Sequence, residues 1–142
     1  MASTVGDELR LMTNGRAKVV GISVKDRAAI LPVGRHASAA YWFSSQVGNM
    51  VSSDYYFSEL PGWVQKFNAS RPADKYFGAK WERLLPEQEY LRRAGEDAPP
   101  WEKVATTKDT NTFPHIITGG AVKPNKDFYD AIDYSPFSMN CS

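Results

Sequence analysis

Residues 18–35 read KVVGISVKDRAAILPVGR, and the α/β fold expected for this chain is built around them. Its apolar run over residues 19–22 has the composition of a buried strand. Lys25 and Arg27 follow just past the expected carboxyl end of that strand, and residues 28–31 are good helix formers. Ligands of open α/β sheets bind outside the carboxyl ends of strands, and a helix N-terminus favours anions. The pattern therefore predicts a cationic pair suited to binding phosphate or carboxylate.

A short amphipathic helix is expected before this strand. Thr4 and Asp7 have the spacing of a capping box, residues 5–12 carry one apolar face, and Asn14 followed by Gly15 is typical of a helix end. A helix, a strand and a second helix in this order indicate an α/β fold.

The chain changes character after residue 38. Residues 40–43 and 50–57 are aromatic and rich in β formers, and a polar stretch with a glycine separates them, which predicts a β-hairpin. Pro61 is suited to the first turn of a helix. Residues 113–117 are expected to form a short strand, and residues 127–137 alternate aromatic and acidic side chains.

The composition is that of an ordinary globular domain. The 142 residues carry a formal net charge of +1, and 23% of them are charged and 42% hydrophobic. A chain of this length is one domain and can bury an ordinary core. The balanced charge gives no overall field that would favour nucleic acid or a membrane surface as the partner.

Cysteine and histidine are scarce in this sequence. Cys141 is the only cysteine, which excludes an intrachain disulfide and a thiolate zinc site, and we assign it no role. His36 and His115 are too few for a multi-histidine metal centre made by this chain alone. No apolar run reaches the roughly 18 to 20 residues that cross a bilayer, and the N-terminus lacks the pattern of a signal peptide. By itself this favours the cytoplasm, unless the chain is part of a longer one.

Three strings in the sequence resemble the alkaline phosphatase superfamily. They are TVGDELRLMTNGRAKVVGISVKDRAAILPVGRHASAAYWF at 4–43, GNMVSSDYYFSELPGWVQKFN at 48–68 and FYDAIDYSPF at 128–137. Within this superfamily, which includes type I phosphodiesterases and nucleotide pyrophosphatases, the chain is most similar to single-chain periplasmic bacterial alkaline phosphatases with a threonine nucleophile. The resemblance implies a hydrolase with a central α/β sheet, two zinc ions and a periplasmic or secreted location for the whole protein.

The resemblance also assigns the family's phosphoryl-binding lysine and arginine to Lys25 and Arg27. Two metal ions stabilise the attacking and leaving oxygens in phosphoryl transfer, while cationic side chains neutralise charge on the remaining oxygens. Arginine's planar fork can contact two oxygens, and lysine supplies a point charge. The family's nucleophile and metal ligands match no residue of this chain. We therefore expect no catalytic residue and no metal ligand here, and zinc only in the parent enzyme.

Because the family's nucleophile and metal ligands are not matched here, we predict that the chain is an internal fragment of a phosphomonoesterase and is inactive alone. Residues 1–37 would be a piece of the α/β core that carries the Lys-x-Arg pair. Residues 38–125 would be an α+β cap-like insertion containing the hairpin, and residues 126–142 a truncated return to the core. The expected partner is a small phosphate ester in the parent enzyme, with no nucleic acid and no membrane, and we expect self-association through exposed fragment edges.

Several other polar residues have simpler interpretations. His36 and His115 each lack a second ligand nearby and match no ligand of the family, which favours structural roles. Asp127, Asp130 and Asp133 are three residues apart and could gather carboxylates for a hard cation. A solvated acidic face is the more usual arrangement and is the interpretation we favour.

Two alternative functions stay open at this point. The parent could be a phosphodiesterase or nucleotide pyrophosphatase, which belongs to the same superfamily. From another class, the chain could be a stand-alone module whose aromatic residues bind carbohydrate or peptide. Tyr41, Trp42, Tyr55 and Tyr56 would then stack on the ligand, although burial in cross-strand aromatic pairs is the interpretation we favour.

Overall fold

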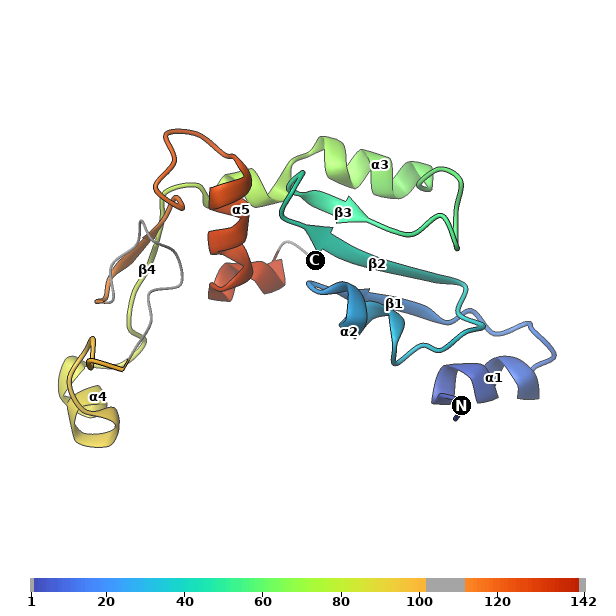
Figure 1. Cartoon of the computed structure of the whole chain (residues 1–142), viewed down its shortest axis with the longest axis horizontal. Helices are drawn as coiled ribbons and strands as arrows, with labels where there is room; N and C mark the ends of the chain where they lie inside the picture. The colour runs from blue at the N-terminus through green and yellow to red at the C-terminus, as the bar shows by residue number, and fades with distance from the viewer. Residues whose placement is uncertain (1, 102–111, 141–142) are drawn as a thin grey trace.

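A computed structural model of the chain describes residues 2–101 and 112–140, and Cys141 lies outside the described residues. The molecule is elongated, with a sheet and α1 at one end, α4 and a two-stranded ribbon at the other, and α5 between them (Figure 1). The elements in chain order are α1 (Val5–Met12), β1 (Val20–Ser23), α2 (Asp26–Ile30), β2 (Ala39–Ser44), β3 (Asn49–Val51), α3 (Gly62–Ala69), the 3-10 helix η1 (Pro72–Tyr76), β4 (Ala79–Trp81), α4 (Glu87–Ala94), β5 (His115–Ile117), α5 (Lys126–Asp133) and the 3-10 helix η2 (Pro136–Asn140).

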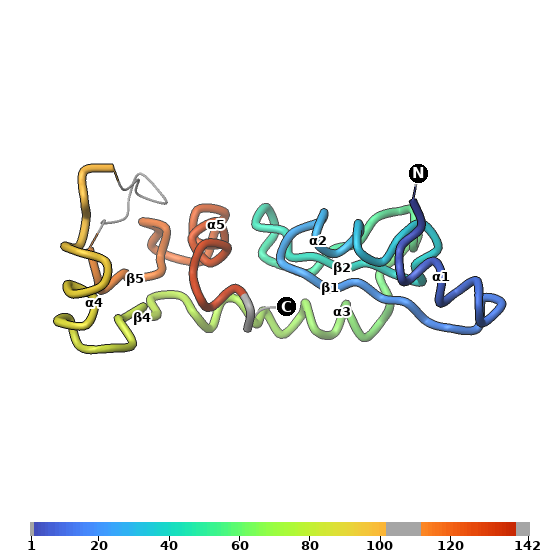
Figure 2. Tube along the Cα trace, turned by 90° about the horizontal axis from the view of Figure 1, so that it is seen from below, coloured from blue at the N-terminus to red at the C-terminus, as the bar shows by residue number. Residues whose placement is uncertain are grey.

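The first sheet has the strand order β1-β2-β3. β1 and β2 are parallel, with Ser23 opposite Trp42, and α2 lies in the connection between them. β2 and β3 are antiparallel, with Ser44 opposite Asn49, and form the predicted hairpin. α2 and α3 lie on opposite faces of this sheet (Figure 2). The division predicted at residue 37 remains a prediction, and the strands on either side of it share one sheet.

The second strand of the hairpin is shorter than predicted. β3 ends at Val51, whereas the aromatic stretch continues to residue 57. The Ser53 hydroxyl accepts a hydrogen bond from the Tyr55 backbone N–H (3.1 Å), and the Tyr56 N–H donates to the Ser53 carbonyl (3.0 Å). Serine side chains that bond to nearby backbone in this way favour turns over strand ladders. The chain therefore leaves the sheet before Tyr55 and Tyr56.

β1 is an edge strand with one open face. Gly21 is buried beneath α2, whereas Val20 and Ile22 are 48% and 55% exposed. The expectation of a buried strand is therefore wrong for these two side chains. The reason is that α2 covers the opposite face of β1, and α3 packs against β3 at the other edge of the sheet.

The main core lies where the hairpin, α3 and α5 meet. Phe128 and Ile132 of α5 and Val64 of α3 are the largest fully buried side chains. The ring of Phe43 in β2 contacts Tyr129 edge to face, with the centroids 6.2 Å apart. Burial of these apolar groups attaches α5 to the first sheet.

A polar network also connects α5 to the turn of the hairpin. The Tyr129 hydroxyl donates to Asp74 Oδ1 (2.7 Å) and accepts a hydrogen bond from Arg71. Arg71 forms an ion pair with Asp74 Oδ2 (3.1 Å) and donates to the Val47 carbonyl (3.0 Å). Gly48, at a φ of +67°, lies so close to the Tyr129 ring that a Cβ atom would overlap it. η1, the β2–β3 turn and α5 are thereby fixed together.

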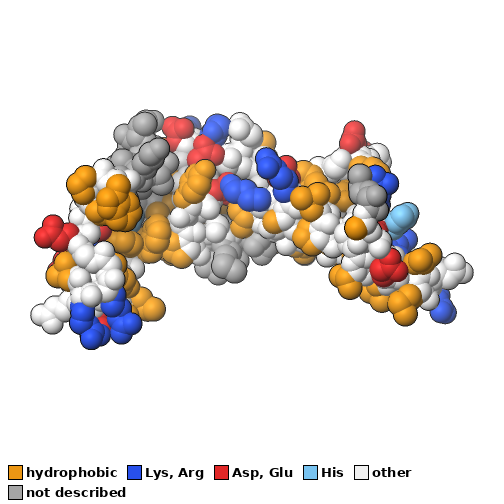
Figure 3. Space-filling model, turned by 60° about the horizontal axis from the view of Figure 1, so that its bottom comes forward, with side chains coloured by type: hydrophobic (Ala, Val, Ile, Leu, Met, Phe, Trp, Pro, Cys, Tyr) orange, Lys and Arg blue, Asp and Glu red, His pale blue; other side chains and the backbone are white. Residues whose placement is uncertain are grey.

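α1 has the predicted capping box and an exposed apolar face. The Asp7 N–H donates to Thr4 Oγ1 and the Thr4 N–H donates to Asp7 Oδ2, both at 3.2 Å. Asn14 and Gly15 adopt positive φ angles after the helix ends, as predicted. Hydrophobic side chains gather on the surface at this end of the molecule (Figure 3), and those of α1 are Val5, Leu9, Leu11 and Met12. Across the described part of the chain, every helix is too short or too polar to span a bilayer.

β4 and β5 form a separate antiparallel ribbon beyond α5. The predicted strand over residues 113–117 is present but begins at His115. Trp81 packs edge to face on Phe113, with the ring centroids 5.3 Å apart. An ion pair between Arg83 and Asp97 (2.7 Å) joins the two sides of the α4 segment.

Candidate phosphate-binding edge

Lys25 and Arg27 lie at the carboxyl end of the parallel β1–β2 pair, where the sequence predicts them. Lys25 follows β1 and is the residue immediately before α2. Parallel strands end at the same edge of a sheet, so Ser44 and Ser45, at the end of β2, lie beside Lys25. An open cavity of about 220 Å³ at this edge is lined by residues that include Lys25, Ser44, Ser45 and Asp133 of α5.

The Lys25 ammonium is held by Asp133. Lys25 Nζ lies 2.5 Å from Asp133 Oδ2, and the lysine side chain is 58% exposed whereas that of Asp133 is only 8% exposed. The hydrogen bond to Asp133 raises the pKa of Lys25, and the negative charge of the nearby Asp130 adds to this effect. Lys25 is therefore fully protonated at neutral pH.

Arg27 is exposed like Lys25 but differs from it in its pairing. Its guanidinium forms no ion pair with any carboxylate in residues 2–101 or 112–140, and its backbone N–H donates to Asp26 Oδ1 (2.7 Å). α2 has only five residues, so the positive charge at this edge comes from the two side chains. The structure thus brings both predicted cations to one edge, one of them paired and the other accessible.

The three aspartates of α5 do not form a metal site. Asp130 pairs with Lys126, Asp133 is bound to the ammonium described above, and Asp127 is exposed. Within the described ranges, no group of three or more His, Cys, Asp or Glu side chains is placed to hold a metal ion. The expectation of a solvated acidic face is wrong for Asp133, because its side chain is only 8% exposed and is bound to Lys25.

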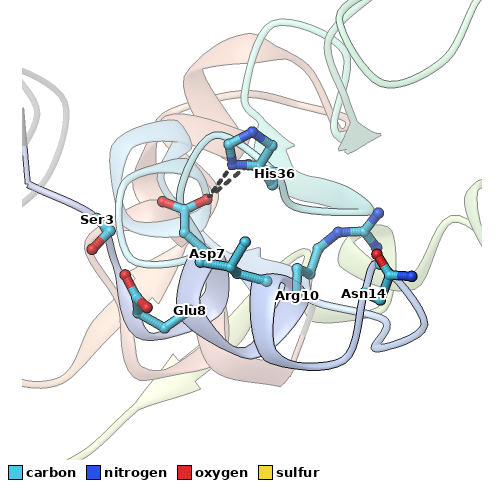
Figure 4. Close-up of a pocket in the computed structure, with 8 residues that line it drawn as sticks. Ser3, Asp7, Glu8, Arg10, Asn14 and His36 are labelled. Carbon is cyan, nitrogen blue, oxygen red and sulfur yellow. Dashed lines mark hydrogen bonds and ion pairs between the residues drawn. The ribbon is translucent and has the colours of Figure 1, made fainter.

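His36 is a partner of the α1 cap. Its backbone N–H donates to Asp7 Oδ1 (2.9 Å), and its ring Nδ1 lies 3.1 Å from the same oxygen (Figure 4). The backbone hydrogen bond from His36 is the main cause that lowers the pKa of Asp7 to about 2. A cavity of about 350 Å³ lies beside this pair and is lined by α1 residues that include Glu8 and Arg10. This arrangement agrees with the structural role predicted for His36.

His115 and Tyr41 pack among aromatic rings. His115 contacts Trp81 and Phe113, with centroid distances of 5.3 Å and 4.6 Å. Tyr41 is buried and stacks on Phe57, with the ring centroids 5.8 Å apart. The ring of Tyr41 is therefore part of the core, in agreement with the interpretation that the sequence favours.

Tyr55 and Tyr56, the two other tyrosines of that set, lie beside a further cavity. Tyr55 and Tyr56 contact each other edge to face at 5.0 Å, and the Tyr55 hydroxyl donates to the Arg35 carbonyl (2.8 Å). The cavity measures about 770 Å³ and is mainly apolar, with Ile30 and Leu31 on its α2 side. It lies away from Lys25 and contains neither of the two predicted cations.

Comparison with known proteins relates the chain to bacterial alkaline phosphatases. It is 44% identical over 117 residues to alkaline phosphatase PhoV of Synechococcus elongatus, which covers 82% of this chain and 21% of the relative. It is 42% identical over 114 residues to alkaline phosphatase PafA of Elizabethkingia meningoseptica, which covers 80% of this chain and 21% of the relative. A protein of Myroides odoratus named calcium-transporting ATPase is 40% identical over 117 residues, again 82% of this chain and 21% of the relative. No family model matches the chain.

The same relationship holds in three dimensions. The crystal structure of wild-type alkaline phosphatase PafA superposes with a TM-score of 0.72 and 34% identity, covering 96% of this chain and 24% of PafA. A PafA variant matches equally well; in it a threonine is replaced by serine, and an asparagine, a lysine and an arginine are replaced by alanine. The replaced lysine and arginine are two positions apart.

The fold is therefore mixed α/β like the matched part of PafA, with two cationic residues at the carboxyl edge of a parallel strand pair. The chain is alkaline-phosphatase-like, as the resemblance of its three strings predicts. It spans about a fifth of the length of the curated relatives that it matches.

Asp133 as the partner of Lys25 is the site residue that sequence reasoning missed. The two residues are 108 positions apart, so no local spacing relates them. The only available signal was that Asp133 follows directly after the apolar residue Ile132, in a string whose aspartates are three residues apart. That neighbourhood indicates the margin of a buried face rather than the middle of a solvated one.

Proposed function

We propose that the chain is a segment of a phosphomonoesterase in which Lys25 and Arg27 bind the non-bridging oxygens of the phosphoryl group. The observation that carries this proposal is the position of both cations at the carboxyl edge of the parallel β1–β2 pair. The PafA variant with a lysine and an arginine replaced two positions apart has the same spacing as Lys25 and Arg27, which supports the proposal.

The chemistry of the two side chains suits a monoester. A phosphate monoester is a dianion, so it gains more from two cations than a diester with its single charge does. Arg27, without an ion pair among the described residues, can direct its planar fork at two oxygens. Lys25 contributes a point charge whose position is already defined by Asp133. A preference for monoesters over diesters follows as part of the proposal.

The proposal assigns phosphate binding to this chain but neither a nucleophile nor a metal centre. The residues that the structure describes do not fit a zinc site, because no set of three ligands is gathered among them. We also propose the three-part division at residues 37 and 125, an exported location for the whole protein, and the lack of hydrolysis by the 142-residue chain alone. These rest on the resemblance of the sequence to the alkaline phosphatases.

The test replaces each cation in a full-length protein that carries this segment. Lys25→Ala and Arg27→Ala are each expected to lower kcat/KM for a phosphate monoester by about 100-fold, the scale for losing one preorganised charge contact. Lys18→Ala is the matched control, because Lys18 is an exposed cation that precedes the amino end of β1, opposite the end that carries Lys25. Unchanged monoester kinetics in both variants would refute the proposal, and a diester rate several orders above the monoester rate would reassign the enzyme as a phosphodiesterase.

The alternative of a stand-alone carbohydrate- or peptide-binding module makes a different prediction. It requires that the isolated chain bind a glycan or peptide through its aromatic side chains in the absence of phosphate. The burial of Tyr41 and the early end of β3 leave Tyr55 and Tyr56 as the aromatic side chains beside a large cavity. Binding that Tyr55→Ala abolishes and Arg27→Ala leaves intact would favour the module.

A further inference from the structure

We infer that Asp133 is a positioning residue for Lys25, placed by α5 at the edge where the phosphoryl group is proposed to bind. The inference rests on the phosphate-binding role proposed for Lys25, and it adds the residue that determines where that positive charge lies. Asp133 acts through the lysine and has no direct contact with the substrate in this proposal.

The ion pair with Lys25 compensates the buried charge of Asp133, whereas the exposed Lys25 could be solvated without it. The Asp133 carboxylate is almost fully buried, and its Oδ2 is bound to Lys25 Nζ. Its other oxygen, Oδ1, is also buried and receives no hydrogen bond from the described residues. Lys25 is therefore the group that balances this buried charge, whereas the exposed lysine side chain could otherwise turn into solvent.

The neighbouring carboxylate on α5 does not compete for the lysine. Asp130 forms its ion pair with Lys126. Burial alone would raise the pKa of the Asp130 carboxyl, but hydrogen bonds from Lys126 and Ser45 lower it overall. Tyr134 faces Lys25 through its ring, with the centroid 5.6 Å from Nζ. Among the described residues, α5 thus presents a single carboxylate to Lys25 at hydrogen-bond distance.

α5 itself is held firmly by the core. Phe128 and Ile132 are fully buried on one side of the helix, and the Tyr129 hydroxyl is bound to Asp74 and Arg71. α5 lies next to the carboxyl edge of the first sheet in both views of the chain (Figures 1 and 2). Because these contacts determine the rotation of the helix as well as its location, the carboxylate of Asp133 has a defined position.

The consequence for phosphoryl binding is a lysine that is ordered before the substrate arrives. A charge held in place contributes more to a reaction step than a mobile one, because its orientation does not have to be restricted during that step. Lys25 and Arg27 therefore have different properties at the same edge. Lys25 is ordered with its charge partly balanced, and Arg27 retains an accessible charge.

The first test observes the Lys25 ammonium directly in the 142-residue chain by NMR of the ¹⁵N-labelled lysine Nζ. Asp133→Asn is expected to lower the pKa of Lys25 toward its ordinary value and to increase the mobility of its ammonium group. Asp130→Asn, which removes the same charge one turn earlier, is expected to change both less. Asp133→Glu keeps the charge and should retain part of the raised pKa. The inference is overturned if Asp133→Asn leaves Lys25 unchanged, or if both asparagine variants change it equally.

The second test is a double-mutant cycle in a full-length protein that carries this segment, with a phosphate monoester as substrate. Asp133→Asn should lower kcat/KM about tenfold, on the scale of coupling between groups in direct contact, and should have no further effect in the Lys25→Ala background. An equal loss in both backgrounds would overturn the inference. If Lys25→Ala alone leaves kcat/KM unchanged, the phosphate-binding proposal is what fails, and the NMR measurement still decides whether Asp133 positions Lys25.

Discussion

Replacing Gly21 by alanine should displace α2 from the sheet and with it the start of the candidate site. Gly21 is buried in β1, and a Cβ atom there would lie 2.0 Å from the Ala29 carbonyl oxygen and 3.1 Å from Val33 Cγ1. The φ angle of Gly21 is not in the left-handed region, so the backbone conformation itself is open to alanine. The whole effect of the substitution is therefore steric.

The size of the effect follows from which atoms collide. The nearest obstructing atoms are the carbonyl oxygen and carbon of Ala29 in the backbone of α2, which cannot move aside as a flexible side chain can. Ordinary contact begins only at 3.4 Å. α2 has to shift by roughly 1 Å or more, which disrupts the packing of Ala29, itself 1% exposed. Overpacking of this kind costs about 3 kcal/mol at the upper end of its usual range.

Urea unfolding of the 142-residue chain measures this cost. With a denaturant dependence of about 2 kcal/mol per molar, Gly21→Ala should lower the urea midpoint by about 1.5 M. Gly62→Ala is the matched control, because a Cβ at Gly62, the first residue of α3, meets nothing within 4 Å. That variant should unfold at the same midpoint or a slightly higher one, since alanine favours helix. Equal midpoints for the two variants would refute the argument that α2 packs directly on β1.

Two further predictions concern hydrogen bonds outside the site. The Asn68 side chain donates a hydrogen bond to the Met50 carbonyl and accepts one from the Met50 N–H, both at 2.9 Å. Asn68→Ala should therefore destabilise the chain by about 2 kcal/mol and speed hydrogen exchange of the Met50 amide. Unchanged exchange would contradict this prediction. The pKa of Asp7 is lowered from 3.8 to about 2, mainly by the His36 N–H, so its stabilising contribution is complete above pH 3.8 and is lost as the pH falls through about 2. A carboxyl NMR titration should detect this low pKa, and Asp7→Asn should remove the pH dependence in that interval; an ordinary pKa for Asp7 would show that the cap is not formed.

The parts of the fold that the sequence predicted depend on local interactions. The α1 cap is one example, because the Thr4 and Asp7 side chains need only the correct spacing to bond each other's backbone. The β2–β3 hairpin is another, because its strands are joined by a short turn. β4 was not predicted, because its partner β5 is distant in the sequence and no short turn joins the two strands. The open face of β1 was also missed, because an apolar run does not reveal which neighbours cover it.

Residues 18–35 alone establish that a lysine and an arginine, two positions apart, follow an apolar strand, and the three strings predicted the alkaline-phosphatase-like fold that the comparisons confirm. The carboxyl end of a strand is specified by the residues around it, so the location of this cationic pair could be inferred without coordinates. The contact of Asp133 with Lys25 across 108 positions, by contrast, depends on the packing of distant elements, as does the lack of an ion pair for Arg27 among the described residues. The physical reason is that the rotation of α5, which aims the Asp133 carboxylate, is determined by the burial of Phe128 and Ile132 against distant parts of the chain.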